Sequence, residues 1–391
     1  MILPGATLGV LGGGQLGRMF AIRAREMGYR VAVLDPEPGC PAAQVADVHV
    51  QGAYDDEAAL ARFAAQVAAV TTEFENVPAD TLAWLRDHCV VRPPVEAVAV
   101  AQDRIREKGF LQANRLPTAP WAPVYDAHGL AAAWREVAAP AILKTSRLGY
   151  DGKGQVRVDR LEELPGAWSA LGEVPCVLER RLALEREISV VLARGEDGAV
   201  AAFPAGENVH RDGILHTTTV PAPVAPALAD AAGALAEAVA ARLAYVGVLG
   251  VELFVAEGGR LFVNELAPRP HNSGHYTMDA CAVDQFEQQV RALCGLPFGD
   301  PRLLSPVAMV NVLGDCWAGG EPRWDRALAL PGVKLHLYGK AQPRPGRKMG
   351  HLTCVAPDPA TALRTALAAH AALAGPGATT PAPLTEEVAC S

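Results

Sequence analysis

The stretch 250-GVELFVAEGGRLFVNELAPRP-270 contains two β-forming runs separated by a pair of glycines. Gly258-Gly259 predicts a two-residue hairpin turn. Counted back from that turn, Glu252 lies directly opposite Glu265. Cross-strand neighbours have Cβ atoms about 5 Å apart, a distance at which two carboxylates repel each other. The stretch therefore predicts a β-ribbon on which two acidic side chains face one another.

The same register pairs Phe254 with Val263, so the neighbours of the two carboxylates are apolar and the acids are expected to be partly buried. Two such carboxylates need a shared proton or a cation between them. Oxygen ligands favour Mg²⁺, bound by one or two carboxylates together with substrate phosphates. Asn264 is expected on the other face, unless the strand bends before Pro268 and brings it round as a third oxygen. The alternative is a shifted register that leaves both glutamates in solvent.

A lysine and a glycine-rich loop lie upstream, in 141-AILKTSRLGYDGKGQVRV-158. Lys144 ends a strand, and Gly149, Gly152 and Gly154 follow in a loop before the next strand. Such a loop can fold over a polyphosphate, with backbone N–H groups on the oxygens and an ammonium group countering the charge. No GKS/T opens a helix, so this is not a Walker A motif. The alternative is a flexible hairpin with a solvated lysine.

Two further acids suit a nucleotide in 176-CVLERRLALEREISVV-191. Glu179 is expected to end one strand and Glu187 to begin another. A carboxylate is the usual partner of ribose hydroxyls. An ordinary exposed charge at the end of a strand explains either residue equally well.

The N-terminal stretch 7-TLGVLGGGQLGRMFAIRAREMGYRVAVLD-35 has the GxGxxG spacing at Gly12, Gly14 and Gly17, and Asp35 closes the next strand. This loop indicates an anion site at a helix N-terminus, without saying which anion. A dinucleotide and a purely structural tight turn are both consistent with it. Strands and helices alternate over the first ~120 residues, which predicts a parallel sheet.

Composition excludes several classes of protein. The net charge of −8 argues against nucleic-acid binding, because counterion release needs a basic face. No apolar run is long enough to span a bilayer, and no basic region precedes the first strand, so we expect neither a membrane segment nor a signal peptide. The eight cysteines are scattered without metal or disulfide spacing, which suits a reducing cytoplasm. Only six of the 35 basic residues are Lys, and four lie in two loops: Lys144, Lys153, Lys340 and Lys348.

Together these features resemble the ATP-grasp superfamily, with its strand lysine, glycine-rich lid, acid-bearing hinge and Glu…Asn-Glu metal ligands. Four motifs sharpen the resemblance: 72-TEFENVP-78, 149-GYDGKGQ-155, 264-NELAPRPHNSGH-275 and 344-RPGRKMGH-351. They are similar to the signatures of the N5-carboxyaminoimidazole ribonucleotide synthase family, which joins bicarbonate to aminoimidazole ribonucleotide (AIR) at the expense of ATP. The resemblance implies an α/β and α+β multidomain fold. The expected parts are a Rossmann-like preATP-grasp domain (1–115), an ATP-grasp lid (116–185), a metal- and nucleotide-binding domain (186–300) and a small β-rich C-terminal domain (301–391).

The resemblance also implies the site residues. ATP would be bound by Arg104, Lys144, Gly149, Tyr150, Asp151, Gly152, Lys153, Gly154, Gln155, Glu179, Arg180, Arg181, Leu182, Glu187, His210, Asn264 and Glu265. Mg²⁺, or alternatively Mn²⁺, would bind Glu252 and Glu265. The catalytic groups near bicarbonate and carboxyphosphate would be Arg269, His271 and Asn272, together with Lys340. AIR would be bound by Gly14, Gln15, Leu16, Glu73, Tyr150, Asp151, Lys340, Arg344 and Arg347, with the Gly12–Gly17 turn near its phosphate. No NAD is then needed.

Three other functions are open at this point. The formate-dependent glycinamide ribonucleotide transformylase shares the fold, ATP and magnesium, and differs in using formate. An NAD-dependent dehydrogenase would use the N-terminal loop. A non-catalytic nucleotide sensor would bind MgATP without turnover. Family members are commonly homodimers, so we expect a cytoplasmic homodimer that binds AIR and bicarbonate.

Overall fold

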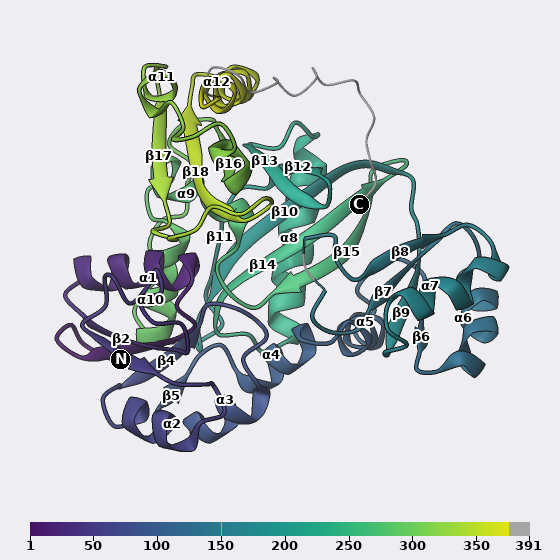
Figure 1. The fold of residues 1–391 in the computed structure, drawn as a ribbon, viewed down its shortest axis with the longest axis horizontal. Helices are drawn as coiled ribbons and strands as arrows, with labels where there is room; N and C mark the ends of the chain where they lie inside the picture. Colours follow the sequence, from purple (N-terminus) through teal and green to yellow (C-terminus); the bar gives the residue numbers. More distant parts are fainter. Residues whose placement is uncertain (150, 375–391) are drawn as a thin grey trace.

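The computed structural model describes residues 1–149 and 151–374. Its strands form three sheets (Figure 1). The first is parallel, with the strand order β3 (Val48–Gln51), β2 (Arg30–Asp35), β1 (Thr7–Leu11), β4 (Ala69–Thr72) and β5 (Val90–Val91). This is the doubly wound arrangement that the alternating pattern predicts, and it places the functional edge at the carboxyl ends of β1 and β4, where the strand order reverses.

Helices cover both faces of this sheet. One face packs against α1 (Gln15–Glu26) and α10 (Gln285–Cys294), which comes from far along the chain. The other face packs against α2 (Glu57–Ala64), α3 (Ala79–Arg86) and α4 (Val95–Ala101). Burial on both faces explains why the strands are almost continuously apolar.

A small antiparallel sheet lies at the opposite side of the molecule (Figure 1). Its order is β6 (Trp121–Val124), β9 (Cys176–Arg180), β7 (Ala141–Thr145) and β8 (Gln155–Val158). The short helices α6 (Leu130–Val137) and α7 (Leu164–Ala170) and the 3₁₀ turns η1 (Ala127–Gly129) and η2 (Leu161–Glu163) complete this unit. The connecting helix α5 (Arg104–Ala113) leads into it from the first sheet.

The third sheet has nine strands. Its main path is β15 (Arg260–Ala267), β14 (Gly247–Ala256), β10 (Leu184–Arg194), β12 (Gly206–Arg211), β13 (Ile214–Val220), β16 (Val307–Leu313), β18 (Lys348–Val355) and β17 (Val333–Leu337), with β11 (Val200–Ala202) paired to β10. The helices α8 (Pro226–Arg242), α11 (Trp324–Leu328) and α12 (Pro359–Ala372) pack on it. Short turns at η3 (Asn272–Gly274), α9 (Thr277–Ala280) and η4 (Gly314–Trp317) complete the described chain.

The β13–β16 pairing makes the C-terminal strands part of the same sheet as the ribbon that bears Glu252. The α/β and α+β fold class expected from the sequence is confirmed, while the boundaries expected at 115/116, 185/186 and 300/301 stay predictions. Within residues 1–149 and 151–374, the helices are all too short or too polar to cross a membrane. The seven cysteines in this part of the chain are free thiols.

Candidate active site

Glu252 and Glu265 are register partners on β14 and β15, as the sequence predicts. The path to that pairing differs from the prediction in two places. The turn has three residues, because Ala256 pairs with Arg260. A β-bulge at Asn264 then inserts one residue, and the two irregularities cancel at the glutamates.

The predicted pairing of Phe254 with Val263 is wrong, since Phe254 pairs with Phe262. The reason is the longer turn, in which both Gly258 and Gly259 adopt positive φ. Asn264 is expected on the opposite face of the ribbon from the two glutamates unless the strand bends. The bulge supplies that bend and brings the Asn264 side chain to the face of Glu252.

Asn264 Nδ2 lies 3.5 Å from Glu252 Oε2. Asn264 Oδ1 is buried and, among the described residues, has no hydrogen-bond partner. The Glu252 side chain is 15% exposed. Burial is the largest single effect and acts to raise its pKa. The hydrogen bonds from His271 and Asn264, with the charges of His271 and His210, together outweigh burial and lower the pKa of Glu252 to about 2. An anionic carboxylate beside an orphaned amide oxygen fits a divalent cation.

A cavity of about 330 Å³ opens over this ribbon. It is lined by residues of the small sheet, of the nine-stranded sheet, and of the helices and loops that connect the strands of the first sheet. The sequence-predicted residues that it brings together are Gln15, Leu16, Glu73, Arg104, Lys144, Gly149, Asp151, Gly152, Lys153, Gln155, Glu187, His210, Glu252, Asn264, Glu265, Arg269, His271 and Asn272. The acidic ribbon and the strand lysine therefore share one cavity, as an ATP site requires.

Ion pairs fix several of the lining side chains. Arg104 Nη1 lies 2.9 Å from Glu265 Oε2, and His210 Nδ1 lies 2.9 Å from Glu187 Oε2. Arg269 Nε donates to Glu75 Oε2 at 2.7 Å. These contacts hold the charged groups in place before any ligand binds.

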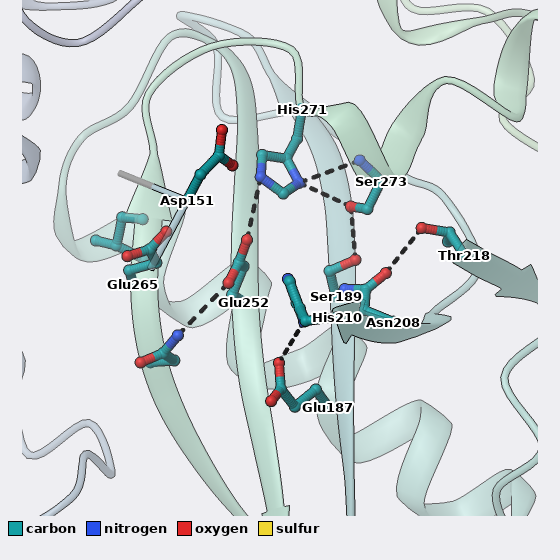
Figure 2. A network of polar contacts seen from close by, with 12 residues as sticks. Asp151, Glu187, Ser189, Asn208, His210, Thr218, Glu252, Glu265, His271 and Ser273 are labelled. Carbon is teal, nitrogen blue, oxygen red and sulfur yellow. Dashed lines mark hydrogen bonds and ion pairs between the residues drawn. The ribbon is translucent and has the colours of Figure 1, made fainter. Parts of the chain in front are cut away.

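His271 connects the acidic ribbon to a chain of hydroxyl groups (Figure 2). Its Nε2 lies 3.1 Å from Glu252 Oε1, and its Nδ1 lies 2.7 Å from Ser273 Oγ, which lies 2.7 Å from Ser189 Oγ. The backbone N–H of Ser273 also points at Nδ1. Because that N–H can only donate, Nδ1 is the acceptor and Nε2 carries the proton that is donated to Glu252.

The N-terminal glycine loop already holds anions of the protein itself. The N–H groups of Gly14 and Gly17 donate to the carboxylate of Glu73, and that of Gly13 donates to Asp35 Oδ2 at 2.7 Å. Gly14 does not line the cavity and its N–H is bonded to Glu73, so the contact with AIR that the resemblance implied stays a prediction. These N–H groups are the donors that a dinucleotide phosphate would otherwise use.

Several other predicted residues do not line the cavity: Gly154, Glu179, Arg180, Arg181, Leu182, Lys340, Arg344 and Arg347. The Glu179 side chain is 3% exposed and its carboxylate meets two lysines, so the ribose contact expected for it is not what its side chain makes. Arg181 pairs with Asp159. Both side chains thus have protein partners within the lid sheet or beneath it, and the nucleotide contacts of this segment stay predictions. Tyr150 lies outside the described residues.

The basic C-terminal loop reaches the glycine-rich lid through Lys348, whose Nζ lies 2.6 Å from Asp151 Oδ1. Lys340 Nζ donates to the Lys348 carbonyl at 2.8 Å. Arg344 and Arg347 bond to Gln342. Of the loop's four cations, Lys348 is the one that lines the cavity.

Sequence reasoning missed three groups that support the site: Glu107, Lys108 and Ser273. Glu107 lines the cavity and accepts the Leu266 N–H at 2.7 Å; burial raises its pKa to about 8. Lys108 is fully buried beneath the site. The scarcity of lysine could have drawn attention to Lys108, because only Lys108 and Lys334 lie outside the two lysine-bearing loops. Ser273 stood inside a quoted motif.

Three family models match the chain in order. Residues 5–102 match the ribonucleotide synthetase preATP-grasp domain, residues 109–286 the ATP-grasp domain, and residues 307–365 the phosphoribosylaminoimidazole carboxylase C-terminal domain. The fold and the cavity, read with these matches, define an ATP-dependent ligase of the ATP-grasp class.

Individual relatives narrow the class. The N5-carboxyaminoimidazole ribonucleotide synthase of Brucella melitensis is 48% identical over 90% of this chain and 97% of its own length. The Staphylococcus aureus enzyme solved with ADP has a TM-score of 0.89 at 35% identity, covering 94% of this chain and 98% of that one. The Aspergillus clavatus enzyme solved with ADP and AIR has a TM-score of 0.85 at 32% identity, covering 92% and 96%.

The chain belongs to the N5-carboxyaminoimidazole ribonucleotide synthase family. The family that the four motifs resemble is thus confirmed, together with the C–N ligase class and the family's reaction, the ATP-dependent carboxylation of AIR.

Proposed function

We propose that this protein carboxylates AIR with bicarbonate, by way of carboxyphosphate, and releases N5-carboxyaminoimidazole ribonucleotide, ADP and phosphate. The observation that carries the proposal is the pairing of Glu252 with Glu265 across the ribbon, in the same cavity as Lys144. Bicarbonate is a poor electrophile, and its phosphorylation by the γ-phosphate of ATP supplies a leaving group for attack by the AIR amine.

Glu252 and Glu265 would hold Mg²⁺, with Asn264 Oδ1 beside them. Among residues 1–149 and 151–374 there is no group of three or more His, Cys, Asp or Glu side chains that could hold a metal. Two carboxylates suit a cation that takes its other ligands from phosphates and water. When bound, the ion would neutralise charge on the β- and γ-phosphates.

The other predicted site residues are assigned to different parts of the substrates according to where they lie. Lys144 and the lid residues would contact the phosphates, and Glu187 the ribose. Arg269, His271 and Asn272 would hold bicarbonate; both polar atoms of the buried Asn272 amide lack a hydrogen-bond partner among the described residues, as expected for a ligand site. Glu73, Asp151 and the C-terminal loop cations, Lys340, Arg344, Arg347 and Lys348, would meet AIR.

Isotope-labelled bicarbonate and formate distinguish this function from its nearest alternative. We expect AIR-dependent ADP formation with label incorporated from bicarbonate and none from formate. Incorporation of formate would instead assign the glycinamide ribonucleotide transformylase reaction. ADP formation that ignores both AIR and bicarbonate would remove the ligase proposal.

A separate variant tests whether Glu265 binds the metal. Glu265→Gln keeps the shape of the side chain and removes the charge, so we expect a loss of ADP formation of about 100-fold or more, with weaker Mn²⁺ binding in the presence of ADP. Glu257→Gln, at the exposed tip of the same ribbon, is the matched control and should retain full activity. Unchanged metal binding in Glu265→Gln would show that the metal lies elsewhere.

We also propose a homodimer that works in the cytoplasm, and the four-part division of the chain given above. Free cysteine thiols support the compartment. Light scattering at enzyme concentrations used in assays would test the dimer, and a monomer mass would exclude it.

A further inference from the structure

Lys108 is completely buried on helix α5, yet it does not line the cavity. Its ammonium group has three partners. Nζ donates to the Asn264 carbonyl at 2.9 Å and to Thr118 Oγ1 at 3.0 Å, and lies 3.2 Å from Glu179 Oε2. An ammonium has three N–H donors, so these partners use its whole capacity and leave none for a nucleotide.

Glu179 is shared between two cations. The oxygen that meets Lys108, Oε2, also lies 3.6 Å from Nζ of Lys144. Lys144 lines the cavity, whereas Glu179 and Lys108 do not. Glu179 Oε2 is thus closer to Lys108 than to Lys144, and Lys108 is the cation that lies away from the cavity.

The charges of this buried group therefore sum to +1, two ammonium groups against one carboxylate. Arg104 and Glu265 also act on Lys144, but they pair with each other at 2.9 Å and add no net charge. Glu107 lies next to Lys108 in the chain, and burial raises its pKa to about 8, so at pH 7 its carboxyl is mostly neutral and the sum is unchanged. Without Lys108 the sum would be zero, because Glu179 would pair with Lys144 alone. In a buried setting one unit of charge a few ångströms from a phosphate has a large effect on binding.

We infer that Lys108 is a positioning residue that occupies Glu179 and so leaves the charge of Lys144 for the phosphates of ATP. The same ammonium holds the carbonyl of Asn264, the bulge residue of the acidic ribbon. Lys108 thus links Lys144, through Glu179, to the β14–β15 ribbon that is proposed to hold the metal. The inference rests on the proposed role of Lys144 as a phosphate ligand.

Four variants test the charge balance: Lys108→Met, Glu179→Gln, the double variant Lys108→Met/Glu179→Gln, and Lys144→Met. The measurements are the dissociation constant of ADP with Mg²⁺ by calorimetry, and KM values for ATP and AIR. We expect Lys108→Met to weaken nucleotide binding about tenfold or more, with a smaller change in KM for AIR. The double variant restores the sum to +1 and should bind within about threefold of the wild type.

Thr118→Val is the neutral control, since it removes one Lys108 partner without changing charge, and it should leave nucleotide binding within about twofold of wild type. A double variant as weak as Lys108→Met, or a Thr118→Val variant equally weak, would show that Lys108 acts only as a structural anchor. If Lys108→Met does not fold, the double variant still tests the inference. Nucleotide binding about tenfold weaker than that of the wild type in the double variant would overturn it. Unaltered binding in Lys144→Met would instead refute the proposed phosphate contact.

Discussion

The backbone N–H of Gly17 donates to Glu73 Oε2 at 2.8 Å, so the first turn of helix α1 is closed by a carboxylate that follows strand β4. The other oxygen of Glu73 accepts the N–H of Gly14. The positive end of a helix stabilises an anion, and here that anion is part of the chain. The glycine loop therefore binds the carboxylate of Glu73, a residue that lines the cavity, with the N–H groups that could otherwise bind a phosphate.

Replacing Glu73 should destabilise the first domain. Glu73→Gln keeps the size of the side chain, but its NH₂ group faces a backbone donor and the charge is lost. We expect the free energy of unfolding in urea to fall by about 1–3 kcal/mol. Glu162→Gln, an exposed acid in the small sheet unit, is the control and should unfold with the wild type. Equal stability of the two variants would contradict the anion role.

Ser273 should control the orientation of His271. Ser273→Ala removes the hydroxyl that lies 2.7 Å from Nδ1 and leaves only the longer contact from the backbone N–H, so the ring is expected to be held less firmly and to donate less well to Glu252. We predict a fall in kcat of about 10-fold or more with little change in KM for ATP. The ¹⁵N shifts of the His271 ring nitrogens report the tautomer directly. Ser169→Ala, on the exposed side of α7, should alter neither property.

Substrate binding should depend on the charge of Lys340. Burial, and then the charge of Arg347, lower its pKa to about 8, although Glu73 and Asp151 act to raise it and Lys348 to lower it further. Lys340 is therefore cationic below about pH 8 and loses its proton as the pH rises through that value. KM for AIR should be nearly flat up to about pH 7 and rise as the pH passes through 8, because the AIR phosphate loses a cationic partner.

Lys340→Arg separates this effect from other titrations. Arginine stays charged throughout the range. The variant should show a flat KM for AIR to pH 9, even if its absolute value differs from that of the wild type. The same rise in both proteins would assign the pH dependence to another group.

Lid closure should depend on a glycine contact. A Cβ on Gly213, in the β12–β13 turn, would lie 2.6 Å from Gly152 Cα in the glycine-rich loop. Gly213→Ala should therefore hold the lid away and admit water to carboxyphosphate, so that more than one ADP forms per N5-carboxyaminoimidazole ribonucleotide. We also expect KM for ATP to rise about tenfold.

Gly198→Ala is the matched control, because Gly198 also has positive φ and lies in a hairpin turn, while its Cβ would meet only Arg194 at 3.6 Å. Both variants carry the backbone strain of alanine at positive φ. A normal ADP-to-product ratio in Gly213→Ala would contradict the role of the contact.

Much of the secondary structure followed from local pattern. Apolar runs such as Thr7–Leu11 and Ala141–Thr145 identify buried strands, and helix α5 begins where Asp103 caps it. Strand β3 is hard to predict, because four residues with only two apolar positions are too short a pattern to identify a strand. Helix α4 is also hard to predict, since the pair Pro93-Pro94 is typical of a break, although Pro94 stands at the N-cap of the helix.

The sequence by itself determined the family and the class of reaction, because motifs are local properties of the chain. It also predicted that Glu252 faces Glu265, but that pairing depends on a bulge at Asn264 that offsets the longer turn. Only the tertiary structure decided how Asn264 turns, which anion fills the N-terminal loop and what Lys108 does. Each of these depends on contacts between residues more than 50 positions apart in sequence. Lys108 donates to the carbonyl of Asn264, the bulge residue, and Glu73 accepts the N–H groups of Gly14 and Gly17. Pairing preferences along one strand carry no information about such distant partners.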